Sequence, residues 1–159
     1  MNRRYSVEEF VEIVKRLRET YNDVILTTDI IVGFPGENEE EFNQTYEFLK
    51  RIKFYKMHIF KYSPRRGTKA EVMGNQVQGD VKEYRSKKLL ELSDINEKEY
   101  LKSYIGKEVE VLFEEKEGEY YKGHTSNYIM VKYKTQEELE NKIINVKINK
   151  IGELCLISD

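Results

Sequence analysis

The chain has 159 residues, of which 39% are hydrophobic and 35% are charged, a composition typical of soluble globular proteins rather than of disordered chains. The formal net charge of −2 favours no class of partner. No run suggests a membrane span or a signal peptide, and one cysteine allows neither an intramolecular disulfide nor a cysteine metal cluster, so we predict a cytoplasmic protein without membrane contact.

The amino-terminal part predicts a helix followed by a strand. Ser6 and Glu9 form a capping box, and apolar residues follow at helical spacing, so a helix with one buried stripe is expected over 6–20. The next apolar run, 24–32, is β-branched on both alternating faces, which predicts a central parallel strand covered on both sides. Asp29 within this run is costly unless it forms a salt bridge or faces a polar cavity.

A second helix, a second strand and a third helix follow. Asn38 with Glu41 indicates the start of the second helix. The run 55–62 predicts a strand in which His58 alternates with hydrophobic residues, so we expect a core histidine there. The third helix is expected from Asp80, which precedes a glutamate by three residues, to about residue 103. Its expected buried side consists of Val81, Tyr84, Leu92 and Ile95.

Two loops, 33–37 and 63–68, come directly after predicted strands. Parallel strands joined by a helix bring such loops to the same edge of a sheet, where barrel and open α/β enzymes build their sites. Gly33 and Gly36 allow a sharp turn, either because a flat ligand lies against the backbone or because the connection is tight. The segment 51–69 has seven basic residues and no acidic one. This charge favours an anionic ligand, or else some of the lysines only keep a helix end and the flanks of a strand in contact with water. We therefore expect part of an active site.

The pattern changes from helical to alternating after residue 106. Five short strands are expected, over 109–113, 120–123, 128–133, 143–148 and 154–157, and they predict a small closed or nearly closed β-barrel. The predicted domains are therefore 1–103 and 104–159. The polar insert 135–141 should be a loop or a short helical turn, and Cys155 should be buried inside the last strand.

Three motifs in the first domain resemble one family. Residues 28–37 (TDIIVGFPGE), residues 60–68 (FKYSPRRGT), and then Gln76-Val77 with Arg85 resemble the radical S-adenosylmethionine methylthiotransferases in order and spacing. The second domain resembles the TRAM domain of those enzymes, a small OB-like barrel that binds RNA. The implied fold is an α/β partial TIM-like barrel, made of the C-terminal strands of a radical SAM barrel, followed by a small all-β OB-like TRAM barrel.

The resemblance implies that the parent enzyme cleaves S-adenosylmethionine at a 4Fe-4S cluster and adds a methylthio group to an adenosine of tRNA. Residues 123–128 are most similar to the branch that acts on threonylcarbamoyladenosine next to the anticodon, and the sibling that acts on isopentenyladenosine is an alternative. The implied partners are tRNA and the missing N-terminal half of the same enzyme. Because this chain lacks the three-cysteine loop, its cluster ligands are absent, no catalytic or metal-binding residue is expected in it, and it should be inactive alone.

The resemblance also implies site residues. An apolar–glycine strand motif, whose backbone approaches the adenine of the cofactor, falls on Ile31 and Gly33. The glutamate of the general version of that motif falls on Gly36, one place before Glu37, and Arg65 matches the arginine of the second loop. The expected cofactor-binding residues are Ile31, Gly33, Phe34, Pro35 and Gly36. The expected substrate- or RNA-binding residues are Arg65, Arg66, Lys122, His124, Asn127 and Lys132.

Two other interpretations stay open. The chain could be a stand-alone TRAM-type RNA-binding module without catalysis. RNA bases would then stack on some of its tyrosines, Tyr120, Tyr121, Tyr128 and Tyr133. The chain could also be a truncated reading frame with no separate role. The second domain has 8 basic and 11 acidic residues, so we expect weak, salt-sensitive tRNA binding that depends on Lys122, Lys132 and the region of Arg65. The coding sequence upstream of Met1 distinguishes these interpretations, and the oligomeric state is open.

Overall fold

The computed structural model describes residues 4–159, so the first three residues of the first predicted domain lie outside it. The chain divides into two compact units, Met1–Asn96 and Glu97–Asp159. This division falls inside a helix, and the predicted domain boundary at residues 103 and 104 stays a prediction. Among the described residues, no helix is both long and apolar enough to cross a membrane.

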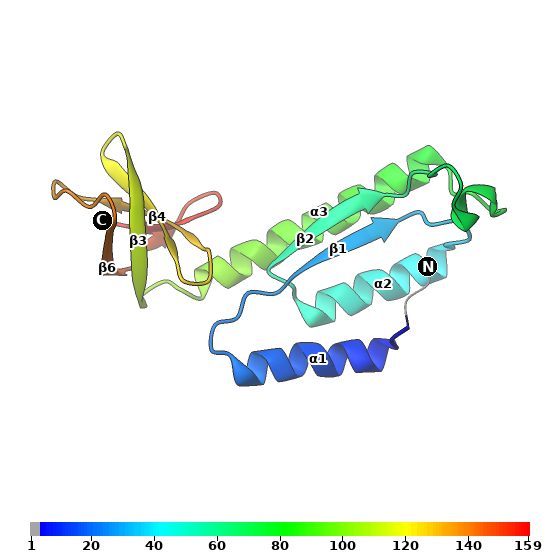
Figure 1. Ribbon diagram of the computed structural model, residues 1–159, viewed down its shortest axis with the longest axis horizontal. Helices are drawn as coiled ribbons and strands as arrows, with labels where there is room; N and C mark the ends of the chain where they lie inside the picture. Colours follow the sequence, from blue (N-terminus) through cyan, green and yellow to red (C-terminus); the bar gives the residue numbers. More distant parts are fainter. Residues whose placement is uncertain (1–3) are drawn as a thin grey trace. The chain divides into compact units, whose positions relative to one another are not determined.

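The first unit alternates helices with parallel strands (Figure 1). Strands β1 and β2 pair in parallel, with Thr27 opposite Lys56 and Val32 opposite Lys61, which confirms the predicted strand–helix–strand arrangement. Two parallel strands with helices between and beside them are consistent with part of a (β/α) barrel. The elements are α1 (Val7–Thr20), β1 (Thr27–Val32), α2 (Glu39–Ile52), β2 (Lys56–Lys61), the short 3-10 helix η1 (Lys69–Val72) and α3 (Gly79–Lys102).

Helices α1 and α2 begin at the predicted capping boxes. The Ser6 hydroxyl accepts a hydrogen bond from the Glu9 N–H at 3.1 Å, and the Glu9 carboxylate accepts one from the Ser6 N–H at 2.8 Å. Asn38 and Glu41 form the same reciprocal pair, with both distances at 2.9 Å. Each box satisfies N–H groups that a helix start leaves without intrahelical partners.

Helix α3 starts differently from the prediction. Asp80 does not form a reciprocal pair with Glu83, because its carboxylate accepts a hydrogen bond from the N–H of Val81 at 2.9 Å. The Glu83 carboxylate accepts one from the ammonium of Lys61 at 2.6 Å instead. The spacing alone predicts the helix but does not decide which partner each carboxylate takes.

The buried side of α3 also differs from the apolar pattern. Tyr84 and Ile95 are 56% and 53% exposed, so their predicted inward positions are wrong, whereas Leu89 is fully buried. The buried stripe includes polar residues such as Ser93, whose hydroxyl accepts a hydrogen bond from the N–H of Met57 at 3.0 Å. A prediction that counts only apolar residues misses these buried polar residues. It therefore places the buried face of α3 at the wrong angle around the helix axis.

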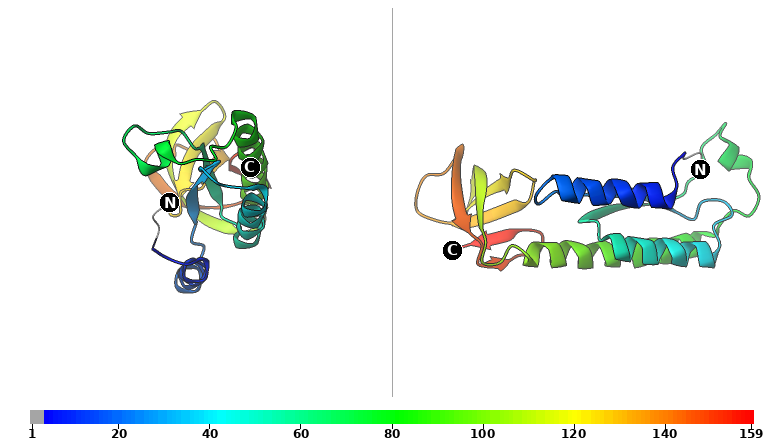
Figure 2. Two further views of the ribbon diagram at one scale, coloured as in Figure 1. Left: turned by 90° about the vertical axis from the view of Figure 1, so that its right-hand side faces the viewer. Right: turned by 90° about the horizontal axis from the view of Figure 1, so that it is seen from below.

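One face of the two-stranded sheet is covered by helices. Val32 and Met57 are buried on this face, and Ile30 and Ile59 pack beside them. Figure 2 shows α2 and α3 along the same side of the sheet. The helices contribute Val14, Phe42, Leu49, Ile52, Leu89 and Leu92 to this core. Phe54, which lies between α2 and β2, belongs to it as well.

The opposite face of the sheet is open in the described residues. Asp29, Ile31, His58 and Phe60 are exposed there, with Ile31 at 38% and Phe60 at 52%. The predictions that the first strand is covered on both sides and that His58 lies in a core are therefore wrong for this chain. The reason is topological, because the helices that connect and flank the two parallel strands pack on one face of the sheet and leave the other face exposed.

The second unit is a six-stranded sheet wrapped around its own core. The strand order is β6-β3-β4-β5-β8-β7, and β5 pairs with β8 in parallel while the other neighbours are antiparallel. The strands are β3 (Glu108–Glu117), β4 (Tyr120–Thr125), β5 (Met130–Lys134), β6 (Lys142–Lys147), β7 (Lys150–Ile151) and β8 (Leu156–Ser158). The largest core side chains include Val111, Phe113, Ile129, Val131, Leu139, Ile148 and Leu156.

Three details of the second unit correct the strand prediction. A sixth, two-residue strand, β7, joins the predicted five. Tyr128 is not in a strand, because its φ of 65° places it in the left-handed region before β5. Cys155 is buried as predicted, but in the bend before β8 rather than inside a strand. The insert 135–141 is a loop, and its Leu139 reaches the core.

Candidate functional site

The two predicted loops begin at the same edge of the first unit. Val32 and Lys61 are opposite each other at the ends of the two parallel strands. One step further, the N–H of Tyr62 donates to the carbonyl of Val32 at 2.8 Å. Gly33 and Ser63 therefore leave the sheet side by side at its carboxyl edge, as the strand–helix–strand pattern predicts.

The 33–37 loop is held by hydrogen bonds within it and by one to Asn75. Gly33 and Gly36 have φ values of 71° and 89°, which favour glycine. The Gly33 N–H donates to the Glu37 carboxylate at 3.1 Å, the Glu37 N–H to the Phe34 carbonyl at 2.9 Å, and the Gly36 N–H to the Asn75 carbonyl at 2.9 Å. Because these three N–H groups already donate to acceptors within the protein, they are not available to a ligand. A ligand at this loop would contact mainly its side chains and its carbonyl groups.

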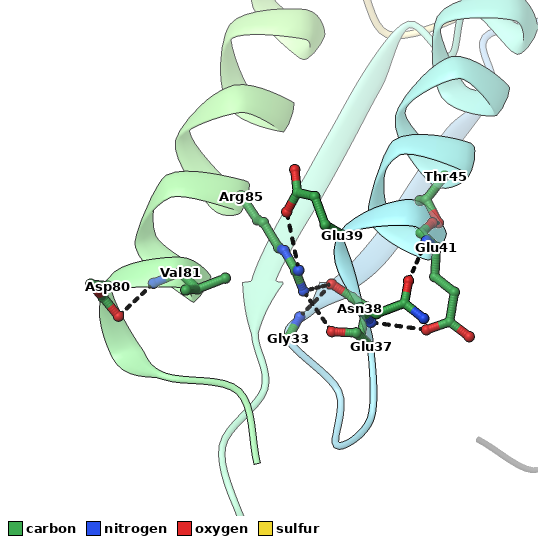
Figure 3. Close-up of polar contacts among 9 residues, drawn as sticks. All are labelled: Gly33, Glu37, Asn38, Glu39, Glu41, Thr45, Asp80, Val81 and Arg85. Atoms are coloured by element: carbon green, nitrogen blue, oxygen red, sulfur yellow. Dashed lines mark hydrogen bonds and ion pairs between the residues drawn. The ribbon is translucent and has the colours of Figure 1, made fainter. Parts of the chain in front are cut away.

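Arg85 braces this loop from α3 (Figure 3). Its guanidinium lies 2.7 Å from the Glu37 carboxylate and also donates to the Glu37 carbonyl at 3.0 Å. A longer contact of 3.3 Å reaches Glu39, and the guanidinium lies 5.2 Å from the centre of the Phe42 ring. The Arg85 side chain is only 4% exposed. Glu37 is thus occupied within the fold. The sequence analysis names Arg85 as part of a family motif but does not predict its contact with Glu37.

Lys82 also contacts this loop, and the sequence analysis did not predict it. Its stem lies over Gly33, where a Cβ atom would come within 2.4 Å of the Lys82 Cγ. Its ammonium donates to the Tyr62 carbonyl at 3.1 Å and lies 5.4 Å from the Tyr62 ring, against which Phe34 packs edge-on at 5.3 Å. Lys82 therefore joins the exits of β1 and β2. The glycine at 33 makes room for this lysine, whereas the Cβ direction of Gly36 is open.

The remaining cofactor candidates lie at the same edge. Ile31 is on the open face of the sheet, where Phe60 is its neighbour across the strands. Asp29 and His58 are opposite each other on that face, one step deeper. Phe34 is half-buried and Pro35 is buried in the loop. The structure thus places Ile31 and residues 33–36 at one edge, next to an open face that carries both apolar and titratable side chains.

An open groove of about 1160 Å³ lies on the helical side of the 33–37 loop. Residues of α1 and α2 line it together with Phe34, Pro35 and Gly36, and its charged lining is mainly acidic, with Glu8, Glu37, Glu41 and Glu47. This groove does not suit an anionic ligand.

The 63–68 loop presents two unpaired arginines. The Thr68 hydroxyl and N–H both donate to the Arg65 carbonyl, at 2.7 and 3.1 Å, and the Gly67 N–H donates to the Glu71 carboxylate at 2.7 Å. Arg65 and Arg66 are exposed, and within residues 4–159 neither guanidinium forms a hydrogen bond or an ion pair. A fixed turn with two exposed guanidinium groups is suited to phosphate or carboxylate.

The two candidate lysines of the second unit are paired with acidic residues. Lys122 and Lys132 are opposite each other on β4 and β5. Their ammonium groups lie 2.7 and 2.9 Å from the Glu117 carboxylate, and Lys122 also lies 3.6 Å from Glu115. Hydrogen bonds from Lys122 and then Lys132 lower the pKa of Glu117, and the hydrogen bond to Glu117 raises the pKa of Lys122. An incoming phosphate would have to displace Glu117.

His124 and Asn127 have different surroundings. The Nδ1 of His124 lies 2.6 Å from the Glu114 carboxylate on the outer face of the sheet. Asn127 accepts a hydrogen bond from the Thr125 hydroxyl at 2.6 Å and donates one to the Tyr104 hydroxyl at 3.0 Å. Asn127 thus fixes the turn after β4, and its role toward RNA stays a prediction.

The residues of this chain do not fit an iron–sulfur cluster. Such clusters are bound by several cysteine thiolates, and the sequence has only Cys155, which is buried. Among residues 4–159, no group of three histidine, cysteine, aspartate or glutamate side chains is arranged to hold a metal ion.

Comparisons with known proteins give a consistent family. Residues 1–49 match the Radical SAM superfamily. The chain is 41% identical over 157 residues to the threonylcarbamoyladenosine tRNA methylthiotransferase MtaB of Bacillus subtilis, a match that covers 96% of this chain and 35% of that protein. It is 39% identical over 154 residues to the tRNA-2-methylthio-N(6)-dimethylallyladenosine synthase of Acetivibrio thermocellus, covering 95% and 32%, and 39% identical over 156 residues to the synthase of that name from Aquifex aeolicus, covering 98% and 36%. The chain spans about a third of the length of these curated relatives.

Proposed function

Because the chain carries a radical SAM segment and is homologous over almost its whole length to tRNA methylthiotransferases, we propose that it is the C-terminal portion of such an enzyme. The observation that carries the proposal is the 41% identity over 157 residues, which includes both loops at the carboxyl edge of the first unit. The parent would add a methylthio group to an adenosine next to the anticodon of tRNA.

In this proposal the first unit contributes a part of the barrel wall. The open face with Ile31, and the loop at residues 33–36, would hold the adenosine part of S-adenosylmethionine by shape and apolar contact, because the loop N–H groups are used internally. Arg65 and Arg66 would bind an anionic group of substrate or cofactor. The parent's iron–sulfur clusters would be bound by residues outside this chain, in an N-terminal half of the same enzyme, so we assign no chemical step to the chain alone.

The second unit would be a TRAM domain with an OB-like barrel, which binds the tRNA. The mainly antiparallel sheet wrapped around one core supports this proposal. Because Lys122 and Lys132 are ion-paired with Glu117, we expect the free guanidinium groups of Arg65 and Arg66 to contribute more to phosphate binding. The location proposed for the protein is the cytoplasm, where its tRNA substrate would be found.

Threonylcarbamoyladenosine is the substrate we propose first, because residues 123–128 are most similar to that branch and the relative named for it is 41% identical over 157 residues. Dimethylallyladenosine is the second candidate, because synthases named for it are 36% to 41% identical over similar lengths. A stand-alone RNA-binding module is the third, supported by the mainly antiparallel sheet of the second unit, which has its own core.

A chimeric enzyme tests the proposal. The matching segment of the Bacillus subtilis relative is replaced by this chain, the chimera is expressed in a strain that lacks its own methylthiotransferases, and tRNA nucleosides are analysed by mass spectrometry. We expect methylthio-threonylcarbamoyladenosine, and its loss when Arg65 is changed to alanine. Methylthio-dimethylallyladenosine instead would favour the second candidate. A folded, cluster-loaded chimera that modifies neither nucleoside would contradict the proposal.

The isolated chain has its own test. After anaerobic reconstitution with iron and sulfide, it should show no cluster absorbance and should not cleave S-adenosylmethionine, and a brown preparation that cleaves it would refute the predicted inactivity. The coding sequence upstream of Met1 should contain the three-cysteine loop in frame. If that loop is missing there and the chain still binds tRNA, the stand-alone module is favoured.

A further inference from the structure

A small hollow lies on the outer face of the second unit, centred on Leu112. Leu112 is in β3, with His124 of β4 opposite it on one side and Ile143 of β6 opposite it on the other. These three residues, with Tyr128, line a hollow of about 300 Å³. Leu112 is 42% exposed and Ile143 is 62% exposed, so the hollow has an apolar floor on a face that is otherwise polar.

Tyr128 stands at the edge of this hollow in a costly conformation. Its φ of 65° is unfavourable for a residue with a side chain, and the residue is 86% exposed, so burial does not compensate for the strain. The turn imposes this conformation, because the Tyr128 N–H donates to the Thr125 carbonyl at 2.9 Å and the Ile129 N–H donates to the Thr125 hydroxyl at 3.0 Å. A strained turn that presents an exposed aromatic ring points to a contact function.

The rim of the hollow is acidic. The Glu114 carboxylate lies 2.6 Å from the Nδ1 of His124, and Glu110 lies on the same lining. The His124 ring centre is 6.4 Å from that of Tyr128. Carboxylates repel phosphate and accept hydrogen bonds from N–H groups. The hollow therefore suits a flat, partly apolar group that carries N–H donors.

We propose that this hollow binds one unpaired base of an RNA strand, which stacks on Tyr128 and donates hydrogen bonds to Glu114 or Glu110. Single-stranded bases bind proteins by stacking on aromatic rings and through their Watson–Crick edges. Guanine fits the rim best, since it has neighbouring N1–H and N2–H donors, whereas uracil has only one N–H on that edge. This inference rests on the proposed RNA binding of the chain. It adds where one base binds and which type of base is preferred.

Binding of short RNA strands to the full chain tests the proposal. Labelled oligouridines with a single central guanine, cytosine, adenine or uracil are titrated with protein, and fluorescence anisotropy gives the affinities. We expect the guanine strand to bind most tightly. Tyr128→Gly removes the ring but suits the left-handed backbone, and it should weaken guanine-strand binding about 10-fold and abolish the base preference. Tyr84→Ala, which removes an exposed ring of α3, is the matched control and should change neither.

Two further variants separate base reading from phosphate binding. Glu114→Gln should reduce the preference for guanine over uracil, while Glu140→Gln, another exposed glutamate of the second unit, should not. Arg65→Ala should weaken all four strands equally. If Tyr128→Gly leaves affinity and preference unchanged while Arg65→Ala weakens binding, the hollow is not a base site although the proposed RNA binding stands. If the wild-type chain binds no strand, both ideas fail.

Nuclear magnetic resonance gives a direct map of the site. Guanosine monophosphate added to the labelled chain should shift the amide signals of Leu112, Tyr128 and Ile143, and uridine monophosphate should shift them less. Shifts confined to other regions would overturn the assignment. An arginine-containing peptide that moves these signals when neither nucleotide does would show that the hollow binds a protein partner instead.

Discussion

The guanidinium of Arg85 and the carboxylate of Glu37, 48 positions apart in the sequence, lie 2.7 Å from each other. The same carboxylate oxygen accepts the N–H of Gly33, so one pair fixes the shape of the 33–37 loop from the side of α3. The Nε of Arg85 is buried without a hydrogen-bond partner among the described residues, which adds to the cost of placing this charge inside the protein. Arg85 therefore holds the 33–37 loop at an energetic cost.

Changing Arg85 to methionine should lower the free energy of unfolding by about 2 kcal/mol, because it leaves the Glu37 carboxylate without its charged partner. Urea denaturation followed by circular dichroism measures the change. Arg66→Met is the control, since Arg66 is exposed and unpaired in the described chain, and should stay within about 0.5 kcal/mol of the wild type. Equal stability of the two variants would show that the brace contributes nothing.

Gly33→Ala should destabilise the protein more than Gly36→Ala. Both glycines have positive φ, which costs an alanine about 1 kcal/mol, but only at Gly33 does the new Cβ meet the Lys82 stem, at 2.4 Å from Cγ. We expect about 3 kcal/mol for Gly33→Ala and about 1 kcal/mol for Gly36→Ala in thermal unfolding. The double variant with Lys82→Ala should recover part of the loss, and no recovery would mean that φ alone decides the cost.

The features of the first unit that are predictable from sequence depend on neighbours within a few residues. The capping boxes of Ser6 and Asn38 form from side chains three positions apart, so a short pattern is sufficient. The parallel order of β1 and β2 follows from the helix between them. The exposure of His58 is different, because an alternating pattern does not show which face of a strand the neighbouring elements leave uncovered.

The candidate site shows the same division. The two loops and their shared edge are predictable from the order of elements, because each loop directly follows a strand. The roles of Lys82 and Arg85 are not, since both belong to a helix whose contacts with the 33–37 loop are set by tertiary packing. The pairing of Lys122 with Glu117 also escapes prediction, because the register of β3 and β4 decides which charges meet.

Glu117 should titrate below its ordinary pKa of 4.5, because Lys122 and then Lys132 donate hydrogen bonds to it in the folded state. A folded pKa below the unfolded value means that these ion pairs stabilise the fold above about pH 4.5, and that the stabilisation is lost as the pH falls through the folded pKa. Carboxyl carbon signals in nuclear magnetic resonance report the titration. Lys122→Gln with Lys132→Gln should move the midpoint back toward 4.5, and an unchanged midpoint would exclude these lysines as its cause.

Gly123→Ala should disrupt the second unit, because the new Cβ would lie 2.2 Å from the Leu112 carbonyl oxygen, which is backbone and cannot rotate away. Gly123 is opposite Phe113, next to the irregularity in the pairing of β3 with β4, so any shift would also move the fully buried Phe113 ring. We expect a loss of at least about 3 kcal/mol, measured by urea denaturation, together with collapsed dispersion of the second unit's amide signals. Gly118→Ala is the control: its φ of 63° costs about 1 kcal/mol, but no atom lies within 4 Å of the new Cβ. If both variants lose the same small amount, the sheet is free to separate at this point, and the outer face that carries Leu112 is less rigid than its packing indicates.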